Sequence, residues 1–153
     1  MSGRSRRGVA GVDVHLAVAA RLEVIGQRYT AVRRGIIDAL LHGSGPRPVT
    51  ELVGGDAPVP LSSAYRNLAD LVQAGAVVRV AGTDDVARFE LAEDLTGHHH
   101  HILCTGCGLV VDVELPGTVE RAMAAAVAEV GEATGFHTTG HRLDLIGLCR
   151  TCS

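Results

Sequence analysis

The sequence contains no tryptophan, and only 3% of its 153 residues are aromatic. Apolar residues still make up 46% of the chain, so the core must be built from aliphatic side chains. A small aliphatic core gives limited stability, and such a chain benefits from a metal ion whose binding free energy contributes to folding. The length is compatible with one domain or with two small ones.

Several kinds of segment and motif are also missing. No apolar run approaches the roughly 20 residues that a membrane-spanning helix needs, and the Arg-rich residues 1–10 are not followed by the apolar segment of a signal peptide. We therefore expect a cytoplasmic protein without a membrane partner. A nucleophile elbow, a phosphate-binding glycine loop and an H-E-x-x-H motif are absent too, which argues against an enzyme.

Lysine is absent, so all 14 basic residues are arginines, the side chain best suited to bidentate contacts with phosphate and guanine. The net charge of −3, taken alone, argues weakly against nucleic acid as a partner. However, residues 1–82 carry ten arginines and six acidic residues, whereas residues 83–153 carry four and eleven. This asymmetry predicts DNA binding by the first half and metal binding by the acidic second half.

Apolar residues recur at helical spacing in the first half of the chain. We expect helices over 14–25, 30–41, 50–53 and 62–74, with Thr30 and Ser62 as N-caps of the second and fourth. Two strands, 76–80 and 86–91, should follow around a turn at 82–85. Short helices followed by a hairpin are the pattern of a winged helix-turn-helix, whose helix 62–74 would enter the major groove of DNA.

The second half has a different element order. After a polar connector at 92–97 we expect strands at 99–103 and 109–114, a helix at 118–130 and a last strand at 141–147. The predicted fold class is α+β. It combines a winged-helix DNA-binding domain at 1–91 (flexible arm 1–12), a hinge at 92–97 and a small α/β dimerisation domain with structural zinc at 98–153. Small domains of this kind often dimerise through sheet edges.

All four cysteines lie in two C-x-x-C pairs, Cys104 with Cys107 and Cys149 with Cys152. Each short loop can present two sulfurs to one tetrahedral ion, so the spacing predicts zinc. Four thiolates leave no open coordination position, and the site should therefore be structural. Disulfides or buried free thiols are the alternatives, although a reducing compartment favours metal.

Four consecutive histidines precede the first cysteine pair. In an extended chain His99 and His101 would share one face and His98 and His100 the other, which predicts two metal sites. The remaining ligands must come from elsewhere, and the available side chains are Glu90, Glu93, Asp94, Asp112, Glu120 and His141. A solvated polar loop and a purification-tag remnant are the alternatives, although the run is internal and adjoins the cysteines.

Polar side chains on the helix at 62–74 could contact DNA. They lie off the apolar stripe and combine phosphate donors with groups able to read base edges; they are Ser62, Ser63, Tyr65, Arg66 and Asn67. Further phosphate contacts could come from Arg28, Arg33, Arg34 and Arg47. Alternatively, this is the polar face that any surface helix has, and the arginines are simply solvated.

These motifs together resemble the ferric uptake regulator (Fur) family of metal-dependent repressors, over nearly the whole chain. The matching segments are 28–33, 63–68, 88–91, the histidine run with Cys104-x-x-Cys107-Gly108, Phe136 with His141, and 147–152. The resemblance implies a homodimer with a winged helix and a dimerisation domain, structural zinc on the four cysteines, and DNA contacts by Tyr65 and Arg66. It implies a sensing site of Glu90, His99, His101 and Asp112, and an additional site of His98, His100, Glu120 and His141.

The chain departs from the family pattern at several points. Val32 stands where the family usually has Gln, and the N-domain histidine ligand expected near Arg47 is absent, with His42 as a substitute. About two extra residues separate Glu90 from the histidine run, so Glu93 or Asp94 could take its place. The cysteine that zinc-sensing actinobacterial-type members have before this run is absent too. Histidine and carboxylate ligands suit Zn²⁺, Fe²⁺, Mn²⁺ or Ni²⁺.

The sequence thus predicts a metal-responsive repressor that binds a palindromic double-stranded DNA operator as a homodimer and controls zinc or iron uptake. A regulatory metal would fix the relative orientation of the two domains. Two alternatives remain. One is a peroxide-sensing repressor of the same fold, in which Fe²⁺ drives oxidation of a histidine ligand. The other is a metal-buffering protein without DNA binding.

Overall fold

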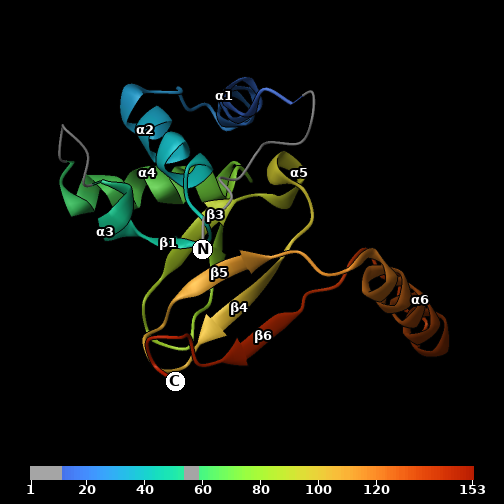
Figure 1. Ribbon diagram of the computed structural model, residues 1–153. Coiled ribbons are helices and arrows are strands. Elements are labelled where there is room, and N and C mark those ends of the chain that lie inside the picture. The colour runs from blue at the N-terminus through green and yellow to red at the C-terminus, as the bar shows by residue number, and fades with distance from the viewer. Residues whose placement is uncertain (1–11, 54–58) are drawn as a thin grey trace.

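The computed structural model describes residues 12–53 and 59–153. Its N-terminal part contains helices α1 (Val14–Val24), α2 (Ala31–Leu41), α3 (Val49–Leu52) and α4 (Leu61–Gln73). These helices pack on a small antiparallel sheet of β1 (Arg47–Pro48), β3 (Arg88–Leu91) and β2 (Val77–Val80), in the order β1-β3-β2 (Figure 1). This arrangement confirms the predicted winged helix-turn-helix. The expected arm at 1–12 lies, apart from Val12, outside the described residues.

The helix starts differ in how well they follow the predicted caps. The Thr30 hydroxyl accepts a hydrogen bond from the backbone N–H of Arg33 at 3.4 Å, so the predicted cap of α2 is confirmed. The predicted Ser62 cap of α4 is wrong. The Pro60 carbonyl accepts the first helical hydrogen bond, from Ala64 at 3.0 Å, and this places Ser62 inside the first turn.

The main apolar core belongs to the N-terminal part. Val14, Val18 and Leu22 recur at intervals of four on α1, which puts them on one helix face, and α1 packs against α4. Every buried residue of this cluster lies between Val14 and Leu95. Burying each Leu or Val contributes about 1.5–3 kcal/mol, so this cluster stabilises the winged helix by itself.

The C-terminal part has the predicted strand–strand–helix–strand order. It comprises β4 (His100–Cys104), β5 (Val110–Val113), α6 (Gly117–Thr134) and β6 (Asp144–Gly147). Strand β4 lies in the centre of its sheet, antiparallel to β5 and parallel to β6. Helix α6 runs past the expected end near Val130 because Gly131 stays helical, and the left-handed stop is Gly135 at φ 74°.

Two short elements were not expected. Strand β1 has only two residues and includes a proline, so it leaves no periodic signal in the sequence. Residues Glu93–Thr96, within the predicted connector, form one helical turn, α5. This turn accommodates the extra residues between β3, which carries Glu90, and the histidine run at the start of β4.

Helix α6 and strand β6 leave apolar surface uncovered. Figure 1 shows α6 standing to one side of the β4–β6 sheet, away from the helices of the N-terminal part. Phe136 and Ile146 are 77% and 69% exposed, and Val119 and Val130 of α6 are exposed too. Of the described residues, those from 98 onward bury only Leu103, Cys104 and Val110 as apolar groups. Apolar surface of this kind is typical of a protein interface.

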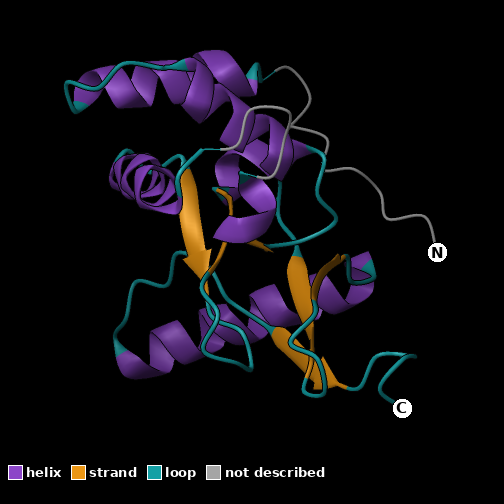
Figure 2. Ribbon diagram, turned by 90° about the vertical axis from the view of Figure 1, so that its left-hand side faces the viewer, coloured by secondary structure: helices purple, strands orange, loops and turns teal. Residues whose placement is uncertain are grey.

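The two parts lie one above the other in Figure 2, with the C-terminus at the bottom, and they contact each other at β4 and β5. The backbone N–H of Asp112 donates to the Ser44 carbonyl at 3.1 Å. A Cβ on the next residue, Gly45, would lie only 2.6 Å from the Val110 carbonyl oxygen, so this close approach requires glycine. From the wing turn, the Thr83 hydroxyl donates to the Cys104 carbonyl at 3.0 Å. Among the described helices, none is long and apolar enough to cross a membrane.

Candidate metal centres

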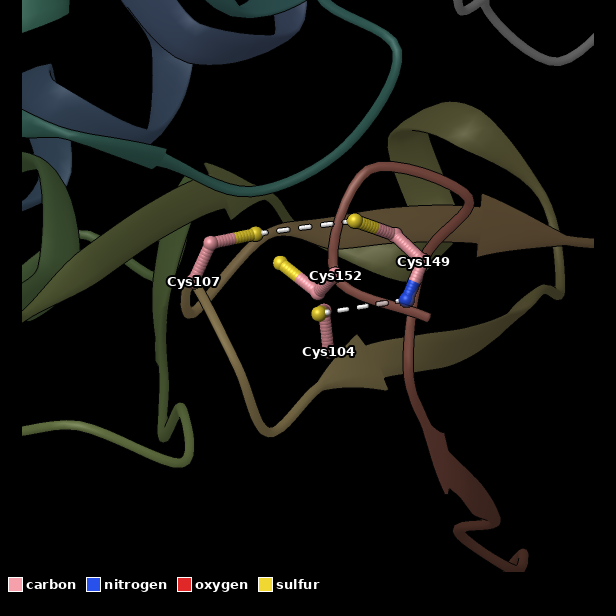
Figure 3. A group of neighbouring side chains, drawn as sticks. All are labelled: Cys104, Cys107, Cys149 and Cys152. Carbon is pink, nitrogen blue, oxygen red and sulfur yellow. Dashed lines mark hydrogen bonds between the residues drawn. The ribbon is translucent and has the colours of Figure 1, made fainter.

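The four cysteines lie together at one end of the β4–β6 pair (Figure 3). Cys104 ends β4 and pairs with Gly147 at the end of β6. Because the two strands are parallel, both C-x-x-C segments lie at the same end of the sheet. All four cysteines are free thiols, and their sulfurs lie within 4.8 Å of one another. The sulfurs of Cys107 and Cys149 are 3.8 Å apart. A tetrahedral ion with Zn–S bonds of about 2.3 Å needs about the same sulfur separation, ~3.8 Å.

Hydrogen bonds already favour the thiolate form at two positions of this cysteine group, because backbone N–H groups lower the pKa of both Cys104 and Cys149. The Cys149 backbone N–H donates to the Cys104 sulfur at 3.2 Å and, with the N–H of Cys107, lowers the pKa of Cys104 to about 6. By contrast, hydrogen bonding to Cys149, and then to Cys107 and Cys104, raises the pKa of Cys152 to about 12. Four sulfurs this close cannot all carry negative charge without a cation among them. The donor set therefore fits Zn²⁺.

A second group, which we call the Glu90 group, joins the two parts of the chain; its members are Glu90, His99, His101 and Asp112. Glu90 lies on β3, whereas the other three come from β4, the residue before it and β5. The Glu90 carboxylate is 3.1 Å from Nε2 of His99 and 3.0 Å from Nε2 of His101. Asp112 pairs with His101 across the sheet, and its carboxylate is 3.7 Å from the same Nε2. Edges of ~3.3 Å are expected around a tetrahedral ion with bonds of about 2.0–2.1 Å, so the spacing fits a divalent transition metal.

The alternative carboxylates are not part of the Glu90 group. Glu93 contacts His98, and Asp94 forms an ion pair with Arg21 of α1. The helical turn α5 takes up the extra residues, and Glu90 can therefore still reach the histidines. His42 is exposed, and its Nδ1 lies 2.7 Å from the carbonyl of Asp38 on its own helix, so it does not join this group either.

A third group, the Glu120 group, consists of His98, His100, Glu120 and His141. Glu120 projects from α6, and its carboxylate is 2.7 Å from Nε2 of His100 and 3.5 Å from Nε2 of both His98 and His141. Nε2 of His141 is buried without a hydrogen-bond partner. Because such an atom needs a ligand or a donor, a metal ion would satisfy it. Adjacent histidines of the run thus belong to alternate groups, as the strand periodicity predicts.

Each of the two histidines of the Glu90 group also has a polar neighbour at its outer ring nitrogen, which sequence analysis missed. Nδ1 of His99 is 2.9 Å from the Gly97 carbonyl, and Nδ1 of His101 is 3.4 Å from the Asp144 carboxylate. A hydrogen bond to the outer nitrogen fixes the tautomer of a metal-binding histidine, as at His99, whereas the Asp144 oxygen lies near His101 without forming a hydrogen bond. The Glu90 carboxylate, followed by the Gly97 carbonyl, raises the pKa of His99 above its usual value. Asp144 lies within the predicted last strand, 141–147, and is the first residue of β6, but only the parallel β4–β6 register places it beside His101.

The predicted DNA-contacting residues divide into exposed and internal ones. Exposed side chains on and near α4 are Arg28, Ser62, Tyr65 and Arg66, and Ser63 is partly exposed. Arg33 is only 5% exposed, and its guanidinium donates to Gln27, the Arg28 carbonyl, Asn67 and Asp70. The structure thus does not place Arg33 where it could meet DNA, because its donors are used to hold α2 against α4. The Asn67 amide is occupied by Arg33 and by the Ser63 carbonyl.

Comparisons with known proteins agree on one family. The model of the "Ferric uptake regulator family" matches residues 25–146. The peroxide operon regulator of Bacillus subtilis (strain 168) is 30% identical over 136 residues, 86% of this chain and 88% of the relative. Among solved structures, the Vibrio cholerae ferric uptake regulator has 25% identity and a TM-score of 0.66, covering 85% of this chain and 98% of that one. A zinc-bound manganese uptake regulator has 27% identity and the same TM-score, 0.66, covering 90% and 99%.

Proposed function

Because the chain belongs to the ferric uptake regulator family, we propose that it is a metal-responsive transcriptional repressor that binds a palindromic DNA operator as a homodimer. The Glu90 group is the observation that carries this proposal. It brings a buried carboxylate of the winged-helix part within 3.1 Å of histidines from the C-terminal part. A metal ion bound there would be held by both parts at once, and its occupancy would govern their relative orientation.

The orientation matters because Glu90 belongs to the same sheet as the strand that follows α4. Glu90 pairs with Val78 of β2, and β2 begins just after α4 ends. Metal binding at Glu90 therefore acts on the element that would carry Tyr65 and Arg66 into the major groove. In a dimer, two α4 helices about 34–36 Å apart would match half-sites one helical turn apart. Metal and DNA would then strengthen each other's binding, typically by about 1–3 kcal/mol.

We assign the three metal groups different roles. The cysteine group would hold structural Zn²⁺, the Glu90 group the regulatory ion, and the Glu120 group an additional ion. The ligands of the Glu90 group suit Zn²⁺ or Fe²⁺, and also Mn²⁺ or Ni²⁺. The bound ion supplies positive charge that offsets the two carboxylates. We place the DNA-binding domain at 1–91, the hinge at 92–97 and the dimerisation domain at 98–153.

The uncovered apolar surface of the C-terminal part supports the homodimer. Phe136, Ile146 and Leu148 are exposed there, although isolated domains of this size usually bury such side chains. A second copy of the same surface would cover them through a two-fold, self-complementary interface.

Metal-titrated DNA binding tests the proposal. DNA fragments would be selected on the metal-loaded protein, and the affinity of one fragment then measured with metal and with a chelator. We expect metal to raise DNA affinity about 5–150-fold, the usual range for a coupling of this size. The double variant His99→Ala and His101→Ala should stay folded and lose the response, whereas His137→Ala, at an exposed histidine outside the three groups, should keep it. Equal affinity with metal and with chelator would refute metal sensing.

The similarity to the Bacillus subtilis peroxide operon regulator favours peroxide sensing as a second candidate function. In that case an iron ion in the Glu90 group would promote oxidation of His99 or His101. Mass spectrometry should then find an added oxygen atom on one of these histidines after peroxide treatment with Fe²⁺, and none with Zn²⁺. Unmodified histidines under both conditions would leave reversible metal sensing as the function.

A further inference from the structure

The Glu120 group extends beyond the C-terminal part through one side chain. His98 has its two ring nitrogens turned to different partners. Nε2 lies 3.5 Å from the Glu120 carboxylate, while Nδ1 contacts the carboxylate of Glu93 in the helical turn α5. A histidine whose outer nitrogen donates to a carboxylate keeps the other nitrogen as a free ligand, the arrangement that orients many metal-binding histidines. Glu93 thus faces the group from the hinge.

The turn α5 is also fastened to the winged-helix part. Asp94, the residue after Glu93, forms an ion pair with Arg21 of α1. Arg21 donates in addition to the carbonyl of Gly75, which follows α4. Leu95 is 1% exposed and packs within the main apolar core. One turn of helix therefore contacts α1, the core below α4 and, through Glu93, a metal-ligand histidine.

We propose that Glu93 is a positioning residue through which a divalent metal ion in the Glu120 group, on His98, His100, Glu120 and His141, orders the hinge and the winged-helix part. Any change in DNA affinity that follows from this ordering rests on the proposed function, whereas the ordering of the hinge does not. A cavity of about 430 Å³ beside Glu93, His98 and Glu120 gives the ion a route from solvent. Three imidazoles and a carboxylate suit Zn²⁺ and similar transition metals.

The exposure of the Glu93–His98 pair explains why the coupling would depend on metal. The two side chains are 54% and 41% exposed, and an ion pair this open contributes little to stability by itself. When a metal binds Nε2, the ring is fixed, and the hydrogen bond from Nδ1 to Glu93 then costs less side-chain entropy. The first residues of the turn α5 are then held from two directions, by the ion through Glu93 and by Arg21 through Asp94.

The variant Glu93→Gln tests this coupling, because it keeps the size of the side chain and removes its charge. Zn²⁺ affinity of the full-length protein would be measured by chelator competition in a background carrying His99→Ala and His101→Ala, so that only the Glu120 group titrates above the structural ion. We expect Glu93→Gln to weaken this binding about 10–100-fold, as loss of such an outer partner usually does. Glu93→Asp should restore part of the affinity.

Hydrogen exchange of the hinge provides the second readout. Zn²⁺ binding to the Glu120 group should protect the amides of residues 92–97 in the parent protein, and Glu93→Gln should abolish that protection. Asp94→Asn is the matched control, because it releases Arg21 from the same turn and should leave Zn²⁺ affinity unchanged. Unchanged affinity in Glu93→Gln, or hinge protection that persists, would overturn the proposal. Neither readout uses DNA, so a failure of the proposed repressor function would be recognised separately.

Discussion

The two parts of this chain are held together by different forces. The winged-helix part has a continuous apolar cluster whose buried residues all lie between Val14 and Leu95. From residue 98 onward, the described chain buries only three apolar side chains and leaves Phe136 and Ile146 exposed. The C-terminal part instead contains the cysteine group and most ligands of the other two groups. Apolar burial stabilises the first part, whereas metal coordination and a second copy would have to stabilise the other.

This difference suits a sensor. A part that needs no metal to fold can be moved as a rigid body, and a part built around ligands can respond to metal supply. The Glu90 group lies where the two meet, and it takes one carboxylate from the apolar part and three ligands from the other.

Cys104→Ser should have the largest effect. Structural Zn²⁺ commonly binds with about 10–16 kcal/mol, and in a part with so little apolar core this energy is folding energy. We expect loss of one Zn²⁺ per chain, unfolding of β4–β6 and loss of the dimer, while α1–α4 keep slow hydrogen exchange. Zinc analysis, light scattering and exchange mass spectrometry would measure this. Thr151→Ser, in the same loop as Cys152, is the control. A dimeric Cys104→Ser protein with slow exchange in β4 would contradict the contrast.

Leu68→Ala should have the opposite effect, because it should destabilise the winged-helix part and leave the zinc-binding part intact. Leu68 is 1% exposed in the main core, and removal of a buried leucine costs about 2–5 kcal/mol. The thermal transition of the winged-helix part should move to lower temperature with the full zinc content retained. Calorimetry and zinc analysis on the same sample would test it. Loss of zinc in Leu68→Ala would mean that the two parts fold as one unit.

Arg33→Met should have the smallest effect of the three. The apolar replacement keeps the volume but leaves Asn67 and the Arg28 carbonyl without their donor, at a cost of about 1–3 kcal/mol. Because Arg33 fixes α4 on α2, we expect DNA affinity to fall even at saturating metal. Arg34→Met, at the exposed neighbouring arginine, should lose less stability. A variant with wild-type melting temperature would show that the network contributes nothing measurable.

The fold and the grouping of ligands follow from local patterns that the sequence contains. Alternation along an extended strand was enough to assign adjacent histidines to different groups, and the C-x-x-C spacing was enough to bring four sulfurs together. Residues whose role depends on pairing between distant strands were missed. Asp144 reaches His101 only through the parallel β4–β6 register. The sequence does not show the burial of Arg33 either, because two of its four partners lie on α4, more than 30 residues away along the chain.

The hinge shows a second limit of sequence reasoning. Counting residues between Glu90 and the histidine run left Glu93 and Asp94 as rivals for one position. The helical turn α5 accommodates the extra residues between Glu90 and the histidine run. As a result, Glu93 contacts His98 and Asp94 contacts Arg21, and neither joins the Glu90 group. A four-residue helix is too short to give a periodic signal, so the sequence predicts only a polar connector at 92–97.

The distance along the chain between the two cysteine pairs has a consequence for biosynthesis. Cys107 and Cys149 are 42 residues apart, with α6 between them. At about 5–20 residues per second, a ribosome needs about 2–8 s to make that stretch. During this interval the winged-helix part has already been synthesised, whereas Cys104 and Cys107 lack the other two zinc ligands, Cys149 and Cys152. In a cell short of zinc, newly made chains would therefore accumulate with a folded winged-helix part and an unfolded C-terminal part.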